Sequence, residues 1–136
     1  MILKMARNII VAGGLALVVV GCSRQQPVYN VVSHPIPAAV TQISLPDMQR
    51  AIVLAGTDRG WTLVPVEPGH LKGHIDHNGH SADIEVLFTT GNYSISYVTS
   101  ANLLATSDGL IHTTYNKWIH QFESDIDRQI IRLALS

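Results

Sequence analysis

Four histidines crowd into one short stretch of the chain, and their side chains suit a transition-metal ion. The set is His70, His74, His77 and His80, with the carboxylates of Asp76 and Asp83 nearby. Imidazole nitrogens and carboxylate oxygens are ligands that zinc, copper and nickel accept. These residue types therefore allow a metal site, although their spacing is not the i, i+4 pair of a helical zinc motif.

Ser94 or Ser100, together with His112 and Asp108, supplies the residue types of a hydrolytic triad. Neither serine lies in a Gly-x-Ser-x-Gly elbow, and no acid has a clear orienting role. Asp108 instead predicts a bend with the glycine that follows it, and Thr113 predicts a helix cap. We therefore predict no catalytic residues and no enzymatic activity.

Two tryptophans and two tyrosines could gather around one amide. The set is Trp61, Tyr97, Tyr115, Asn116 and Trp118. Such residues could line a small groove for a peptide, glycan or lipid, with the amide orienting the ligand. In the alternative, which the spacing favours, the rings pack in the core over a sheet, while Asn102 and Asn116 hold a long loop by hydrogen bonds.

Alternation of apolar and polar residues predicts the strands that must position these side chains. The predicted strands cover residues 61–66, 71–77, 80–88 and 93–99. Asn78-Gly79 predicts a two-residue type I′ turn, because both residues tolerate the left-handed backbone conformation. The strands then form an antiparallel four-stranded meander.

The turn at Asn78-Gly79 sets the register of the central hairpin. It pairs His77 with His80 on one face and His74 with Asp83 on the other, so the four histidines divide between two faces. The remaining predicted pairs are Ile75 with Ala82, Gly73 with Ile84, Leu71 with Val86, Lys72 with Glu85, Phe88 with Tyr93, Val86 with Ile95, and Ile84 with Tyr97. One face is then apolar and the other polar, as expected for a sheet with one buried side.

The first strand fits this register less well. Pairing across the Pro68-Gly69 turn would point Val64 and Val66 inward and turn Trp61 and Leu63 outward. A bulge would reverse this arrangement. Both alternatives remain open at the level of sequence.

Apolar residues with helical spacing lie before and after the predicted strands. Ser44-Leu45-Pro46-Asp47 has the form of a capping box and predicts a helix over 45–58. Apolar residues recur at steps of three and four from Tyr115 to Leu133 and predict a last helix that begins near Thr113. The expected fold class is α+β, a two-layer sandwich in which a four-stranded antiparallel meander has both helices on one face, in the order α-β-β-β-β-α.

The N-terminus has the residue order of a secretory signal. Lys4 and Arg7 precede an apolar run over 9–20, which is too short to span a bilayer as a helix. Val19-Val20-Gly21-Cys22 resembles a bacterial lipobox, which implies cleavage before Cys22 and acylation of its thiol and new amino terminus. An ordinary signal peptide and a buried N-terminal helix are the alternatives. By analogy with enteric lipoproteins, Ser23 in place of Asp implies an outer-membrane destination facing the periplasm, with exposure at the cell surface as the alternative.

These patterns divide the chain into three segments. Residues 1–21 are the predicted signal peptide, residues 22–43 a lipidated N-terminus and flexible tether with three prolines, and residues 44–136 a single α+β domain. Nine Lys+Arg against ten Asp+Glu argue against a nucleic-acid binder, and 46% hydrophobic residues argue against a disordered chain. The single cysteine excludes an intramolecular disulfide.

A series of short motifs resembles a set of small uncharacterised proteobacterial lipoproteins. The series is Gly60-Trp61, Pro68-Gly69, His80-x-Ala82-x-Ile84, Tyr93-Ser94-Ile95-Ser96-Tyr97, Ser100-x-Asn102-Leu103 and Ile111-His112-x-x-Tyr115-Asn116-x-Trp118. With the lipobox, the resemblance covers most of residues 60–120. It implies a lipoprotein of this fold class and carries no activity.

Two expectations on function follow. The first is a non-enzymatic envelope lipoprotein, held in the outer membrane by the lipid on Cys22, whose domain binds an envelope protein or a cell-wall component. It has no cofactor besides the covalent lipid and no nucleic-acid partner. The alternative is a periplasmic metal-binding lipoprotein that uses the histidine-rich hairpin.

Overall fold

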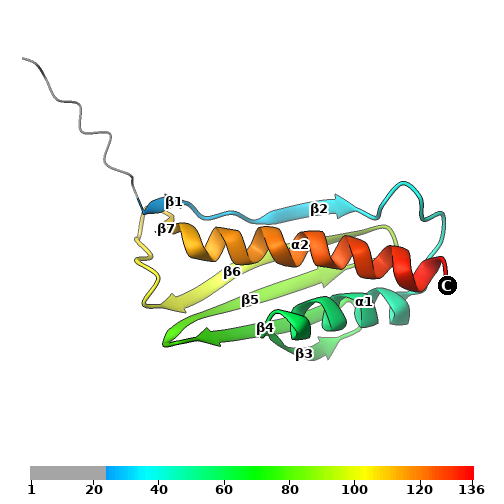
Figure 1. The fold of residues 1–136 in the computed structure, drawn as a ribbon, viewed down its shortest axis with the longest axis horizontal. Helices are drawn as coiled ribbons and strands as arrows, with labels where there is room; N and C mark the ends of the chain where they lie inside the picture. Colours follow the sequence, from blue (N-terminus) through cyan, green and yellow to red (C-terminus); the bar gives the residue numbers. More distant parts are fainter. Residues whose placement is uncertain (1–23) are drawn as a thin grey trace, which may run out of the picture.

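Residues 24–136 are described by the computed structural model and form seven strands and two helices (Figure 1). The elements in chain order are β1 (Gln25–Pro27), β2 (Val31–Pro35), α1 (Leu45–Asp58), β3 (Thr62–Glu67), β4 (His70–His77), β5 (His80–Phe88), β6 (Asn92–Ala101), β7 (Leu110–His112) and α2 (Thr113–Ala134). The predicted signal peptide and Cys22 lie outside the described residues.

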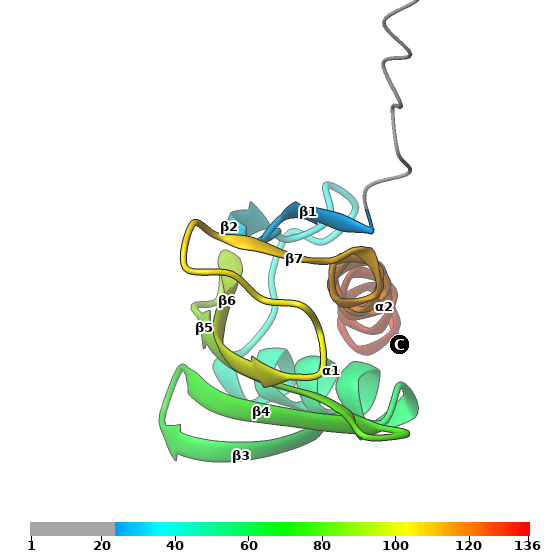
Figure 2. The same ribbon diagram turned by 90° about the vertical axis from the view of Figure 1, so that its left-hand side faces the viewer.

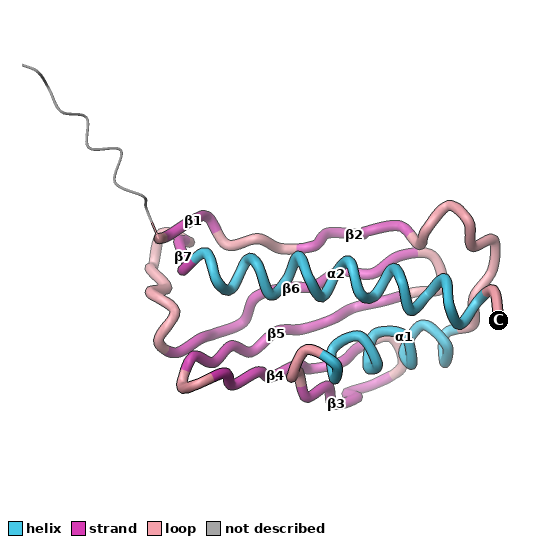
Figure 3. The backbone as a smooth tube through the Cα atoms, in the orientation of Figure 1, coloured by secondary structure: helices cyan, strands magenta, loops and turns pink. Residues whose placement is uncertain are grey.

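An antiparallel five-stranded sheet in the order β2-β6-β5-β4-β3 forms one layer, and β1 pairs with β7 in a separate two-stranded sheet. The larger sheet curves around the two helices (Figure 2). Both helices run along the strands rather than across them (Figure 3). The α+β class with an antiparallel sheet is confirmed, whereas the prediction of four strands is wrong, because β2 adds a fifth strand beside β6.

The central hairpin has the register that its turn predicts. His77 pairs with His80 and His74 with Asp83. Asn78 and Gly79 both have positive φ, at 53° and 83°. The other pairs predicted for β4, β5 and β6 are also present. Local turn chemistry is therefore sufficient to align the middle of the sheet.

A bulge decides the orientation of β3. The register between β3 and β4 shifts between Pro65 and Glu67. Val64 and Val66 are consequently 55% and 50% exposed, while Trp61 is 2% exposed. The bulged alternative is confirmed, and the inward orientation of the two valines is wrong.

Both helices begin where their sequences predict. Ser44 Oγ accepts a hydrogen bond from Asp47 N at 3.2 Å and caps α1. The cap of α2 is His112, whose Nδ1 accepts from Thr114 N at 3.0 Å. The prediction of Thr113 as this cap is wrong, because Thr113 is already the first helical residue and its N–H bonds to the backbone near the N-terminus.

Residues 24–43 belong to the folded body, so the prediction of a flexible tether over 22–43 is wrong for them. β1 ends at Pro27 and β2 at Pro35, so these prolines terminate short strands. Val31, Val40 and Ile43 are buried and join the core. The segment was hard to recognise because its strands are short and pair with residues far along the chain.

The core fills the space between the sheet and the helices. Its largest fully buried side chains are Tyr93, Tyr115, Phe122, Met48, Ile52, Leu71, Ile84, Ile95, Ile111, Ile119, Ile126 and Ile130. Gly56 brings α1 close to α2, since a Cβ there would lie 3.2 Å from the Phe122 ring. Neither described helix combines the length and hydropathy that a bilayer span needs.

Candidate ligand-binding groove beside helix α2

Two of the four histidines lie on the solvent face of β4 beside carboxylates. His74 Nδ1 lies 2.7 Å from Asp83 Oδ1, which is the cross-strand pair that the register predicts. His70 Nε2 lies 3.5 Å from Glu85 Oε1, a longer ion-pair contact without hydrogen-bond geometry. Each histidine therefore has its own acidic neighbour.

The other two histidines lie at the hairpin end. His80 Nδ1 lies 2.7 Å from Asn102 O, while the His77 ring packs edge-on against Trp118 with centroids 6.4 Å apart. Within residues 24–136, no group of three or more His, Cys, Asp or Glu side chains is arranged to hold a metal ion. The fold does not bring the four histidines together.

The residues considered for a hydrolytic triad take part in separate structural contacts. Ser100 Oγ lies 2.8 Å from Tyr97 OH, and His112 Nδ1 caps α2. Ser94 Oγ accepts from a β2 backbone N–H at 2.8 Å, and Asp108 accepts from a threonine hydroxyl two residues away. Among the described residues, no hydrogen bond joins two members of this set.

The five residues considered for an aromatic groove do not line one together. Trp61 and Tyr115 are buried, and the Trp61 ring stacks on Phe122 with centroids 5.8 Å apart. Tyr97 and Trp118 are partly buried against the core. The core alternative therefore describes the four rings, and only Asn116 lines a larger surface hollow.

That hollow opens between α2, β1 and the C-terminal end of α1, and we call it the α2 groove. Its volume is about 580 Å³. Its lining residues are Gln26, Arg59, Thr113, Asn116, Lys117, His120, Gln121, Ser124 and Arg128. Those on α2 recur at helical spacing, so they share the helix face beside the apolar one.

Basic side chains dominate the charge of the α2 groove. Its lining includes Arg59, Lys117 and Arg128 and no acidic residue. Asp125 lies beside the lining, where its Oδ2 is 2.6 Å from Arg59 Nε and its Oδ1 contacts Arg128. Lys117 makes no ion pair within residues 24–136. The groove therefore offers cationic and amide donors to an anionic or hydroxyl-rich ligand.

Asn116 forms part of the wall between the groove and the core. Its Oδ1 accepts from Tyr29 N at 2.9 Å, and its Nδ2 donates to Pro27 O at 2.9 Å and to Gln26 Oε1 at 3.3 Å. The expected loop-holding role is therefore wrong for Asn116, which holds the N-terminal segment instead. It is confirmed for Asn102, whose Nδ2 donates to Gly79 O at 2.7 Å.

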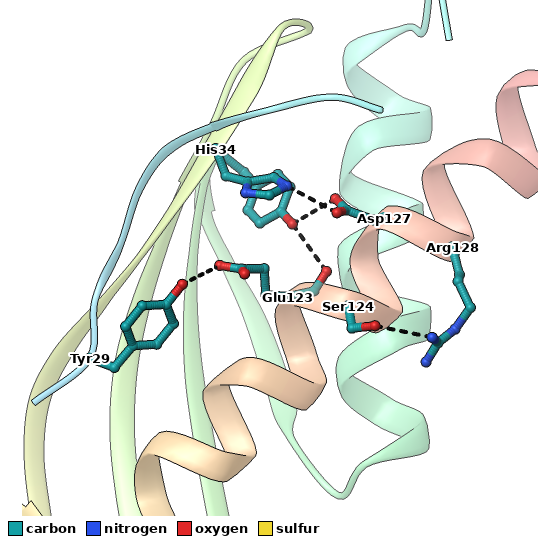
Figure 4. A network of polar contacts seen from close by, with 7 residues as sticks. Tyr29, His34, Glu123, Ser124, Asp127 and Arg128 are labelled. Carbon is teal, nitrogen blue, oxygen red and sulfur yellow. Dashed lines mark hydrogen bonds and ion pairs between the residues drawn. The ribbon is translucent and has the colours of Figure 1, made fainter. Parts of the chain in front are cut away.

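A second set of polar contacts fastens the same segment further along α2 (Figure 4). Tyr29 OH donates to Glu123 Oε2 at 2.8 Å, and its ring stacks on His120 with centroids 4.0 Å apart. Burial, with the hydrogen bond to Glu123 as the next cause, raises the pKa of Tyr29 to about 12. The groove residue His120 is thus positioned by a tyrosine of the N-terminal segment.

Asp127 joins α2 to two neighbouring strands, β2 and β6. Its Oδ1 accepts from Tyr93 OH at 2.8 Å, and its Oδ2 lies 2.9 Å from His34 Nε2 (Figure 4). Burial is the main cause that raises the pKa of Tyr93, and the hydrogen bond to Asp127 adds to it. The carboxylate therefore has a partner on each oxygen, as a partly buried charge requires.

Glu123 and Asp127 of α2 are not fully exposed carboxylates. They lie half-buried beside the N-terminal segment. One signal was available, because Asn116, His120, Glu123 and Asp127 recur at steps of three and four and form a polar stripe.

No protein-family model, curated protein or solved structure matches the chain. The class of ligand that suits the α2 groove is therefore inferred from the side chains that line it.

Replacing Asn116 with alanine should lower the free energy of unfolding by about 1–3 kcal/mol, because Tyr29 N–H and Pro27 O lose their partner. Urea denaturation measures the change. Gln129→Ala, on the same helix, is the matched control and should change stability by less than about 0.5 kcal/mol. Equal stabilities for the two variants would contradict the role given to Asn116.

Stability should also fall as the pH rises above 10. The unfolded chain ionises Tyr29 near its usual pKa of 10.0, whereas the folded chain retains the proton until about pH 12. The unfolded state then binds fewer protons, so the stabilisation is complete below pH 10 and is lost through this window. Urea midpoints on both sides of pH 10 should fall less steeply for Tyr29→Phe than for the wild type. Identical slopes would contradict the prediction.

Proposed function

We propose that the chain is a non-enzymatic lipoprotein of the bacterial envelope whose domain binds an envelope component at the α2 groove. Residues 1–21 are removed as a signal peptide, and Cys22 carries the lipid that anchors the protein in the outer membrane, facing the periplasm. The partner is an envelope protein or cell-wall component that presents anionic or hydroxyl groups.

The observation that carries the anchoring proposal is the position of Cys22. It directly follows the apolar run and the small residue Gly21, and it is the only cysteine in the chain. Acylation also accounts for a lone thiol in an oxidising compartment. Several acyl chains on one residue would hold the protein in the bilayer without a basic patch.

The lining of the α2 groove supports the binding proposal. Lys117 has no ion-pair partner among the described residues, and Arg59 and Arg128 share the single carboxylate of Asp125. An acidic partner would complete the charge balance of this surface. A second hollow of about 450 Å³ beside the start of α1 is less suited to this role, because its only charged lining residue is Glu67.

Acylation is tested by mass spectrometry of the protein from bacterial membranes. The mature chain should begin at Cys22 and carry diacylglyceryl and N-acyl mass. Cys22→Ser should retain the leader, lack these lipids and be missing from the outer-membrane fraction. A wild-type protein with an unmodified Cys22 thiol would contradict the anchoring proposal.

Partner binding is tested by photocrosslinking in living cells, with a photoreactive residue at Gln121 in the groove. A discrete crosslinked species should form and should be lost in Lys117→Glu, because this change places a negative charge in the groove. Arg132→Glu makes the same charge change on an exposed part of α2 outside the lining and should preserve the crosslink. Equal crosslinking in both variants would contradict the assignment of the groove.

A further inference from the structure

The described part of the chain begins at Arg24, two residues after the proposed acylation site. Arg24 O accepts a hydrogen bond from Thr113 N at 2.8 Å, and β1 begins at Gln25. Because consecutive Cα atoms are 3.8 Å apart, the Cα atoms of Cys22 and Arg24 are separated by at most about 7.6 Å. The headgroup layer of one leaflet is itself roughly 5–7 Å thick. A lipid on Cys22 therefore keeps this end of the body against the membrane surface.

The loop over 102–109 lies at the same end of the body. Gln25 Nε2 donates to Leu104 O at 2.8 Å, and Val28 N donates to Gly109 O at 2.9 Å. Figure 1 shows β1, β7 and the start of α2 together at this end, with the C-terminus at the other. The loop thus lies against β1, at the end where the described part of the chain begins.

Two consecutive leucines of this loop have opposite environments. Leu103 is buried, and its carbonyl accepts from His112 N at 2.7 Å. Leu104 is 56% exposed and has a φ of 54°, which is an uncommon conformation for leucine. The bonds around it hold the loop in this shape, so an apolar side chain stays in solvent at the end where the described part of the chain begins.

The loop is also anchored to the central hairpin. Asn102 Nδ2 donates to Gly79 O at 2.7 Å, and His80 Nδ1 lies 2.7 Å from Asn102 O. The loop and the hairpin turn therefore form one surface that is supported by the sheet. Asp108 is the only charged residue of the 102–109 loop, and its carboxylate accepts a hydrogen bond from the Thr106 hydroxyl. Residues 104–107 are uncharged, which suits contact with the interface of a bilayer.

We propose that the 102–109 loop is a membrane-contact surface and that Leu104 enters the headgroup layer of the bilayer that holds Cys22. This inference rests on the acylation proposed above. The occupant is a phospholipid surface, because the short connection from Cys22 leaves this end of the body beside the membrane. The N-terminal end of α2 then lies nearest the membrane, and the α2 groove extends outward along the helix for about 22 Å, at 1.5 Å per residue from Thr113 to Arg128.

The test places a fluorescent label in the acylated full-length protein. Because acylation blocks Cys22, the only cysteine, Leu104→Cys provides a single reactive thiol for a polarity-sensitive nitrobenzoxadiazole dye. Leu135→Cys is the matched control, since Leu135 is 61% exposed and lies at the opposite end of the body. Both proteins are reconstituted into vesicles of phosphatidylethanolamine and phosphatidylglycerol.

The label at position 104 should emit at shorter wavelength than the label at 135. It should also be quenched several-fold less by aqueous iodide and several-fold more by a headgroup nitroxide lipid. Circular dichroism confirms that both variants are folded. Equal quenching at the two positions, in protein shown by mass to be acylated and bound to vesicles, would overturn the membrane contact. An unacylated Cys22 would instead overturn the proposed function.

A linker variant tests the role of the short connection. Inserting about 20 Gly and Ser residues between Ser23 and Arg24 adds a mean separation of roughly 25 Å. The protein should remain bound to vesicles, while the label at position 104 should become as accessible to iodide as the label at 135. Unchanged protection would contradict the inference that chain length imposes the contact.

Discussion

The hydrogen bonds between residues 26–34 and α2 are the constraint on which the other features of this protein depend. Asn116 binds the backbone at Tyr29 and Pro27, Glu123 binds the Tyr29 hydroxyl, and Asp127 binds His34. These contacts hold a segment whose two strands are only three and five residues long against the helix, where β2 can pair with β6. Without them, strand pairing and the burial of Val31 would have to offset the unfavourable entropy of ordering this segment alone.

The same contacts connect the proposed ligand site to the proposed anchor. Asn116 contributes to the α2 groove, and His120 stacks on Tyr29, so the N-terminal segment determines part of the groove wall. That segment also leads directly from Arg24 toward Cys22. The proposed acylation and membrane contact are thus at one end of the folded body. The proposed ligand site lies along one side of the same body. A partner in the groove would meet the protein close to the bilayer.

Each polar residue that joins the N-terminal segment to α2 has a hydrogen-bond partner in the folded chain. Asp127 has one partner on each carboxylate oxygen, and Tyr93 donates from the core side of the helix. A satisfied polar network of this kind favours one arrangement of strand and helix over others, because a shifted arrangement would leave charges without partners. Hydrophobic packing alone is less directional.

The central part of the fold follows from the amino-acid sequence alone, because the interactions there are local. Asn78-Gly79 sets the β4–β5 turn, the alternation of side chains sets the buried face, and Ser44 marks the start of α1. The fifth strand and the groove were decided by tertiary contacts such as that between Tyr29 and Asn116, which are 87 residues apart. The contact of His74 with Asp83 follows from the turn register, whereas the contact of His80 with the carbonyl of Asn102, 22 residues away, depends on how the later loop folds back. Local periodicity records which face of an element is buried, whereas the partner that covers a polar stripe is chosen only when distant segments meet.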